Sequence, residues 1–289
     1  MNMSRKTAMH LFAAIATILW ALGYVMTRIA VRHFTVEAVS FLRYLIAALS
    51  LILYGVIRKV RLPKLKDLPL FFLGGAIGFS VYVYAINAGS KTLPASVVSF
   101  LVSASPILTA LLALVFLREK IGMVGWISVI CAFSGVGIIT FFSEGLPFAS
   151  GVIWISFATI LISLYNVYQR KLLIRYSPLE ITTYCIIAGA LLLSIFAPQS
   201  FPQLATAALP EIIAIVILGV LSGSAAYLCW ATALSKASKT NKVTNYMFVT
   251  PILTTFLGFI LIGETPHASA YAGGALVLAG VVMINWRDP

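Results

Sequence analysis

The sequence is poor in charge, and above all in negative charge. Charged residues make up 10% of the 289 residues, and only 8 residues are Asp or Glu against 20 Lys or Arg. Soluble domains usually carry about 25% charged residues and about 45–50% apolar ones. Apolar residues reach 61% here. This composition excludes an ordinary water-soluble domain and is typical of a chain whose main solvent is lipid.

Catalytic and metal-binding groupings are also missing from the sequence. The three cysteines lie in apolar segments and share no metal-ligand spacing, and the three histidines lie near the ends of such segments. No apolar segment carries Asp or Glu near its middle. These absences argue against a membrane-embedded enzyme and against tight coupling to a proton relay. The sequence predicts no cofactor and no metal site.

The excess of basic residues gives a net charge of +12, and these residues sit at the ends of apolar segments. They form no basic stripe, and no soluble module is present to carry one. We therefore expect no nucleic-acid partner. Anionic lipid headgroups and the orientation of the chain in a bilayer account for this distribution better.

Apolar segments of about 20 residues, the length needed to cross a bilayer, recur along the whole chain. We expect ten transmembrane helices, at residues 10–29, 37–57, 68–88, 94–117, 123–142, 149–169, 178–197, 210–233, 241–262 and 268–286. With the N-terminus in the cytoplasm, 16 of the 20 basic residues fall on the cytoplasmic side. The pattern predicts a multi-pass protein of a bacterial-type plasma (inner) membrane with both termini cytoplasmic.

The chain resembles itself at a fixed spacing. A shift of 145 residues brings Tyr82 onto Tyr227 and the tetrapeptide PILT at 106–109 onto PILT at 251–254. A shift of 142 brings Arg28 onto Arg170. We interpret this as a duplication, with one five-helix repeat at 1–145 and a second at 146–289. Because five is odd, the second repeat enters the membrane inverted. The predicted fold is all-α, with two inverted repeats around a central cavity, as in secondary transporters.

Several segments resemble a known family. They are FLRYLIAAL at 41–49, SPILTALLALVFLREK at 105–120 and TPILTTFLGFILIGET at 250–265. Together they resemble the EamA-type branch of the drug/metabolite transporter superfamily, and within it the YddG-type amino acid exporters. The resemblance implies ten helices and export of amino acids, especially aromatic ones. The superfamily also holds sugar-phosphate and nucleotide-sugar carriers, which use basic residues inside the bundle. Arg43 is the one basic residue clearly within a predicted span, which argues against a phosphorylated substrate.

Polar and amphipathic residues inside the spans are the candidates for lining a pathway, because they are costly against lipid. Asn can hold a carboxylate or amino group, and aromatic faces can receive a cation or another ring. The predicted substrate-binding residues are Trp20, Tyr24, Tyr82, Ser99, Ser163, Asn166, Tyr227, Thr244, Asn245 and Tyr246. The alternative for each is structural: Ser and Thr join membrane helices, and Trp and Tyr form interfacial belts.

Pro106 and Pro251 are expected to interrupt the fourth and ninth spans at matching positions, either as hinges or as static kinks. Arg43 is expected to pair with carbonyls at a helix end, and substrate contact is the less favoured alternative. Glu119 and Glu264 are expected to interact with the exposed N–H groups of the helices that follow them.

The predicted function is that of a secondary transporter, an exporter or facilitator of neutral amino acids, aromatic ones included, working by alternating access. The predicted partners are the small-molecule substrate and the lipid bilayer, and the sequence is compatible with a monomer. A carrier of other small metabolites or drugs is the main alternative. A channel and a membrane-embedded enzyme are less favoured.

Overall fold

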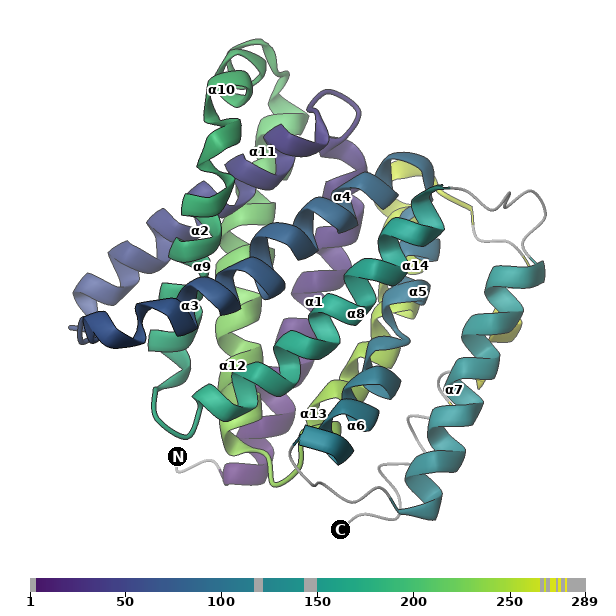
Figure 1. Ribbon diagram of the computed structural model, residues 1–289. Coiled ribbons are helices and arrows are strands. Elements are labelled where there is room, and N and C mark those ends of the chain that lie inside the picture. The colour runs from purple at the N-terminus through teal and green to yellow at the C-terminus, as the bar shows by residue number, and fades with distance from the viewer. Residues whose placement is uncertain are drawn as a thin grey trace.

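The computed structural model describes residues 4–116, 122–142, 150–265, 268, 271–273, 275–276 and 279. Every regular element within these ranges is a helix, and the long helices run side by side as a bundle (Figure 1). Eight helical segments of this described part are long and apolar enough to cross a membrane. Most of the tenth predicted span, at 268–286, and Glu119 lie outside the described residues.

Four predicted spans form uninterrupted helices: α1 (Arg5–Ala30), α2 (Val36–Ile57), α7 (Met123–Phe142) and α8 (Ser150–Leu172). The seventh begins as α9 (Pro178–Leu193) and continues through a short turn into α10 (Ala197–Thr206). Polar caps set several starts. Thr35 accepts a hydrogen bond from the Ala38 N–H at the start of α2, and Ser177 and Glu180 form a capping box on α9.

The remaining described spans are each built from two helices in line. They are α3 (Leu68–Gly75) with α4 (Val81–Thr92), α5 (Ala95–Val102) with α6 (Ser105–Phe116), α11 (Leu209–Ile217) with α12 (Ala226–Lys236), and α13 (Asn241–Thr244) with α14 (Thr250–Ile262). A π-helical segment joins the halves at Ala76–Ser80 and again at Leu218–Ala225. The α5–α6 span is broken at residues 103–104, and α13 and α14 are joined by a 3₁₀ turn at Asn245–Val249. A shift of 145 residues places the first π-helical segment within the second. It also places the break at 103–104 within the 3₁₀ turn at Asn245–Val249.

The prolines lie at these breaks. Pro106 is the second residue of α6, and Pro251 is the second residue of α14. They therefore stand in the first turn of a new helix, where a missing N–H costs little, rather than in the interior of a continuous one. Both prolines lie at an interruption of their span, as expected. They begin a new helix, however, and do not interrupt a continuous one.

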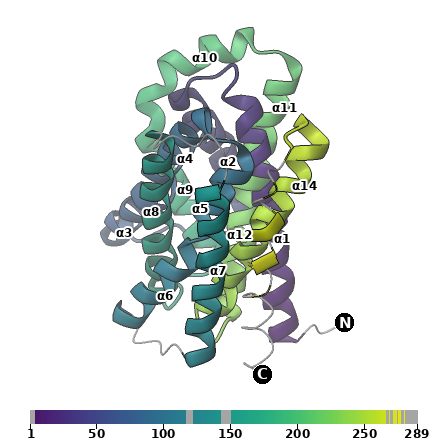
Figure 2. The same cartoon turned by 90° about the vertical axis from the view of Figure 1, so that its right-hand side faces the viewer.

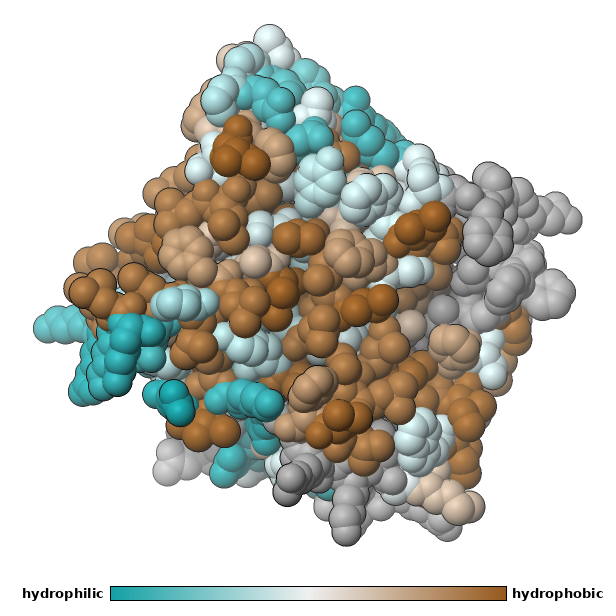
Figure 3. Space-filling model, in the orientation of Figure 1, coloured by the Kyte–Doolittle hydropathy of each residue, from teal (hydrophilic) through white to brown (hydrophobic). Residues whose placement is uncertain are grey.

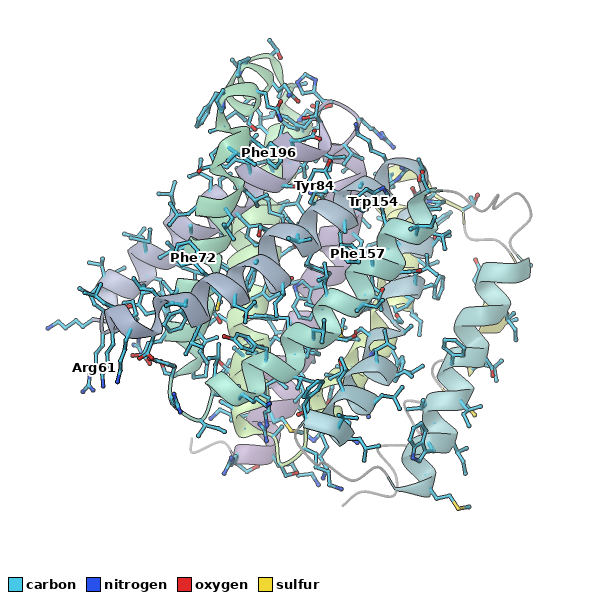
Figure 4. The ribbon with its side chains drawn as sticks, in the orientation of Figure 1. Arg61, Phe72, Tyr84, Trp154, Phe157 and Phe196 are labelled. Atoms are coloured by element: carbon cyan, nitrogen blue, oxygen red, sulfur yellow. The ribbon has the colours of Figure 1, made fainter. Side chains whose placement is uncertain are left out.

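The molecule has two polar ends separated by an apolar band. The start of α1 and the 58–64 loop lie at one end, and α10 lies across the other (Figures 1 and 2). Hydrophilic residues gather at these ends, and hydrophobic ones cover the face between them (Figure 3). Tyr84, Trp154 and Phe196 lie close together near the α10 end (Figure 4), with ring centroids of Tyr84 and Trp154 5.8 Å apart. Such a cluster is typical of a membrane interface.

The helices pack in matching pairs. α1 lies along α12, and α8 lies along α4. α9 packs on α3, while α2 packs on the π-helical segment that starts at Leu218. Close approach depends on glycine at equivalent positions. A Cβ on Gly74 would lie 2.7 Å from the Cys185 sulfur, and one on Gly219 would lie 2.6 Å from the Ile46 Cβ.

Candidate functional site

A small cavity lies between α1, α2, α4 and α12. Its lining residues are Trp20, Gly23, Tyr24, Thr27, Arg43, Tyr82, Ile86 and Tyr227. The space open to water-sized molecules is about 20 Å³, enough for a single water molecule. This cavity is thus small in this conformation, and an amino acid does not fit in it without movement.

The two π-helical segments position two of the cavity tyrosines. Tyr82 is the second residue of α4 and Tyr227 the second residue of α12, so each directly follows a π-helical segment. A π-helical turn adds a residue and rotates the helix that follows, and such turns are frequent at functional sites. The Tyr82 hydroxyl lies within interaction range of those of Tyr24 and Tyr227. Equivalent residues of the predicted repeats therefore meet at the centre.

Aromatic rings form one wall of the cavity. The Trp20 ring lies edge-on to Tyr227 with centroids 5.0 Å apart, and 4.9 Å from the ring of Trp230. Trp230 is fully buried and donates a hydrogen bond of 2.9 Å from Nε1 to Asn166 Oδ1. Asn166 therefore lies behind the cavity wall rather than on it. The sequence reasoning missed Trp230, although a tryptophan in mid-span was a usable signal.

Arg43 lies on the cavity, whereas the sequence favoured a pairing with helix-end carbonyls over substrate contact. Its side chain lines the cavity and is 6% exposed. Its Cζ lies 5.6 Å from the centre of the Tyr44 ring, within cation–π range. The Nε has no hydrogen-bond partner, and none of the hydrogen bonds in the described part of the chain joins this guanidinium to a helix-end carbonyl. In place of the expected pairing with carbonyls, the guanidinium contacts the Tyr44 ring and lines a cavity with several aromatic residues.

Three predicted site residues donate hydrogen bonds to backbone carbonyls, and one of them, Ser163, joins two helices. Ser163 donates to the Ser105 carbonyl at 3.1 Å and to the Thr159 carbonyl at 2.7 Å. Ser99 donates to the Ser96 carbonyl at 2.7 Å, and Thr244 to the Asn241 carbonyl at 3.5 Å. These bonds supply partners for carbonyls near the interrupted helix turns.

Asn245 and Tyr246 lie in the 3₁₀ turn between α13 and α14. The Tyr246 hydroxyl lies 2.7 Å from His10 Nδ1, which connects this turn to α1. Asn245 is buried, and its Nδ2 has no hydrogen-bond partner. The structure thus brings four predicted residues together at the cavity, Trp20, Tyr24, Tyr82 and Tyr227, and places the other six behind or beside it.

A polar cluster closes the bundle at the α10 end. Arg28 Nε lies 3.2 Å from Glu264 Oε1, and Arg28 Nη1 donates to the Ser90 carbonyl at 2.8 Å. Glu264 Oε2 accepts a 3.2 Å hydrogen bond from the N–H of Ala95, the first residue of α5. Glu264 therefore accepts a hydrogen bond at the N-terminus of α5, which belongs to the other predicted repeat. The expected partner, the helix that follows Glu264, lies mostly outside the described residues.

A similar cluster closes the opposite end. Arg170 donates to the carbonyl oxygens of Leu234 and Ala237, the second at 2.7 Å, at the end of α12. Arg5 donates to the nearby Lys236 carbonyl at 3.1 Å. Arg28 and Arg170 are related by the shift of 142, and each binds carbonyls at the end of a helix preceded by a π-helical segment.

Nothing in the described ranges gathers three or more His, Cys, Asp or Glu side chains in a way that could hold a metal ion. The cavity itself carries one cation, one indole N–H, the Thr27 hydroxyl and three tyrosine hydroxyls. The chemistry that this arrangement can perform is binding by hydrogen bonds, charge and ring contacts.

A small polar cavity inside an apolar helical bundle, with arginines bonded to helix-end carbonyls at both ends of the bundle, fits a membrane transporter. Comparison with known families agrees, because the EamA-like transporter family matches residues 7–141 and again 149–286. The chain belongs to the EamA-like transporter family.

Three relatives and one solved structure illustrate the similarity. The chain is 32% identical over 266 residues to the uncharacterized transporter YdfC of Bacillus subtilis, covering 91% of this chain and 86% of that protein. It is 29% identical to a probable terminal-alkyne amino-acid exporter of Streptantibioticus cattleyicolor, over 98% of this chain and 95% of the relative. An S-adenosylmethionine uptake transporter of Rickettsia bellii is 24% identical over 78% of this chain and 72% of its own length.

A protein crystal structure matches with a TM-score of 0.75 and 18% identity, over 99% of this chain and 100% of the other. At that identity the match establishes the fold alone. The names of the relatives point to transport rather than to enzymatic chemistry.

Proposed function

We propose that this protein is a secondary transporter of neutral amino acids, aromatic ones included, that works by alternating access. The observation that carries the proposal is the small aromatic cavity containing Arg43, which lies between α1, α2, α4 and α12. A channel needs a continuous pathway, whereas a carrier passes through conformations closed at both ends. The small volume of this cavity, about 20 Å³ among the described residues, favours a carrier.

The proposed mechanism uses two inverted five-helix repeats at 1–145 and 146–289. Two matches to one family, one in each half, support this division. The π-helical segments and the equivalent arginines support it further, because each occurs once in each half. The matched helix pairs also support it, because the contact of α1 with α12 corresponds to that of α8 with α4 when the two halves are exchanged. Two copies of one unit can exchange conformations at a small energy difference, which gives inward- and outward-open states.

The proposed orientation places the start of α1 and the 58–64 loop in the cytoplasm and α10 outside, in a bacterial-type plasma membrane. The charge distribution supports it. Five basic residues lie between 58 and 66 alone, whereas the exposed segment at α10 carries none. Cytoplasmic loops of membrane proteins carry the excess of Lys and Arg.

The proposed substrate class rests on the cavity and on one relative. Trp20, Tyr24 and Tyr227 offer ring faces and edges to an aromatic side chain. The relative named as an amino-acid exporter aligns over nearly the whole chain, which supports amino acids and the export direction that the resemblance to YddG-type exporters implies. The S-adenosylmethionine transporters make that molecule a necessary member of any substrate panel.

The test is uptake into proteoliposomes of purified protein, with labelled phenylalanine, tryptophan, leucine, S-adenosylmethionine and a sugar phosphate, with and without a pH gradient. We expect saturable uptake of the neutral amino acids down their gradient, and no requirement for the pH gradient. Uptake of the sugar phosphate with no uptake of any amino acid would overturn the substrate class.

A further inference from the structure

The cavity between α1, α2, α4 and α12 holds a buried cation, Arg43, that forms no ion pair within the described part of the chain. Arg43 is 6% exposed, and its Nε lacks a hydrogen-bond partner. The ion pair found in the described part of the chain joins Arg28 to Glu264, so Arg43 has no carboxylate partner there. A charge taken out of water is costly unless it is paired, and a position that keeps such a charge calls for a partner.

The groups around Arg43 share one hydrogen-bonding character. Trp20 Nε1 is buried and, like the Arg43 Nε, has no partner, and indole nitrogen only donates. The hydroxyls of Tyr24, Tyr82 and Tyr227 lie on the same cavity and can donate as well. No Asp or Glu is among the residues that line it. The cavity therefore offers an excess of donors and positive charge, which matches an anionic acceptor.

The geometry of the site favours one class of anion, a carboxylate. A guanidinium binds a carboxylate through two parallel N–H bonds, a geometry that the flat carboxylate fits. The aromatic rings of Trp20 and Tyr227 line the same cavity as Arg43 and suit a ring or apolar chain attached to that carboxylate. A phosphate dianion would need more positive charge, and only one basic residue lines the cavity.

The site is asymmetric between the two halves. The shift of 142 that relates Arg28 to Arg170 places Cys185 at the counterpart of Arg43, and Cys185 is buried where α9 packs on α3. The cation therefore belongs to one half only. A ligand bound there has one fixed end, its carboxylate, directed at α2.

We propose that Arg43 is the carboxylate-binding residue of the substrate site, and that the protein recognises aromatic or apolar carboxylates through it, with no requirement for the ammonium group. The inference rests on the proposed function, and it extends the substrate class from amino acids to their analogues that lack the amino group. The cavity of about 20 Å³ accepts little more than one water, so the surrounding helices must separate when the ligand enters.

The test is competition against labelled phenylalanine in proteoliposomes, with three analogues that differ in charge. 3-Phenylpropionate keeps the carboxylate and lacks the ammonium, whereas phenylalaninamide and phenethylamine lack the carboxylate. We expect 3-phenylpropionate to compete within a few-fold of phenylalanine, and the other two to be at least about tenfold weaker, because hydrogen bonds to charged groups are lost.

Variants then assign the effect to this residue. Arg43→Gln is expected to raise KM for phenylalanine at least about tenfold and to abolish the preference for the acid over the amide. Arg43→Lys keeps the charge without the fork and should recover part of the affinity. Arg58→Gln, at the exposed end of α2, is the matched control and should leave both values unchanged.

Stability of the purified protein in detergent gives a readout independent of transport. 3-Phenylpropionate should raise the thermal unfolding temperature of the unmodified protein and not that of Arg43→Gln. Failure of every amino acid to be transported, with stabilisation by 3-phenylpropionate intact, would refute the proposed function and keep this site. Equal competition by acid and amide, or an unchanged KM in a folded Arg43→Gln protein, would refute the role of Arg43.

Discussion

Arg28 Nε and Glu264 Oε1 lie 3.2 Å apart, although 236 residues separate them in the chain. The pair joins α1 to the segment after α14 and is partly buried at the α10 end of the bundle. The same arginine holds the end of α4 through the Ser90 carbonyl, and the same glutamate holds the start of α5. α1, the junction of α4 with α5 and the segment after α14 are therefore tied at one point. In the proposed mechanism these three segments must separate to open this end.

Loss of this ion pair should favour opening at the α10 end. Glu264→Gln keeps an acceptor for the Ala95 N–H but removes the charge, which weakens closure by about 1 kcal/mol and shifts populations several-fold. The measurement is labelling of Thr27→Cys, on the cavity, by an impermeant maleimide from outside, with the three native cysteines replaced by alanine. Labelling should be several-fold faster with Glu264→Gln. An unchanged rate would show that the pair does not hold this end closed.

Replacement of the prolines should affect the two access states in opposite directions. Pro106→Ala and Pro251→Ala each restore a backbone N–H at a break, which lets the two half-helices join, an effect of the order of 1 kcal/mol. Accessibility of Thr27→Cys from each side should shift oppositely in the two variants. Pro63→Ala, in the loop before α3, is the control. Unaltered accessibility and full transport in both variants would make the prolines static kinks.

Close packing of α3 on α9 predicts a sharp effect of one methyl group. A Cβ on Gly75 would lie 2.7 Å from the Gly189 nitrogen and 2.8 Å from the Cys185 carbonyl oxygen, so backbone must move. Gly75→Ala should destabilise the protein by roughly 1–3 kcal/mol, measured by thermal unfolding in detergent. Gly122→Ala, where no atom of another described residue lies within 4 Å of the added carbon, should change stability little. Equal unfolding temperatures for the two variants would contradict the packing.

The bond from Trp230 to Asn166 predicts a non-additive pair. Trp230→Phe leaves the buried Asn166 Oδ1 without its donor and should cost about 1–3 kcal/mol of stability. Asn166→Leu combined with Trp230→Phe removes both polar groups, and the double variant should lose less stability than the sum of the single ones. Additive losses would mean that the two side chains do not interact energetically.

Eight of the predicted spans match helical segments of the described chain that can cross a membrane, and they could be predicted because lipid imposes a simple rule of length and apolarity. The cavity tyrosines could be found because Tyr82 and Tyr227 coincide in the predicted repeat. The π-helical segments could not be predicted, since an additional residue per turn is stabilised by packing partners distant in sequence, as at Gly75 against Gly189.

Arg43 could not be placed on the cavity for a related reason. Its depth in α2 can be read from hydropathy, but the direction of its side chain depends on how α2 packs on its neighbours. The partner of Glu264 is hidden in the same way, because Arg28 and Ala95 reach it only through the tertiary fold. The roles of Ser99, Ser163 and Thr244 remain predictions, and the structure places their hydroxyls at helix breaks.

We propose that the protein is an amino acid carrier that alternates between an inward-open and an outward-open state. Counterflow tests this proposal most directly. Proteoliposomes of purified protein are loaded with unlabelled phenylalanine and diluted into a trace of labelled phenylalanine, and the internal label is followed with time. For a carrier, we expect labelled phenylalanine to accumulate transiently above its external concentration. This accumulation should be saturable and independent of an imposed pH gradient. Label that only approaches the external concentration, at a rate unaffected by internal phenylalanine, would contradict a carrier.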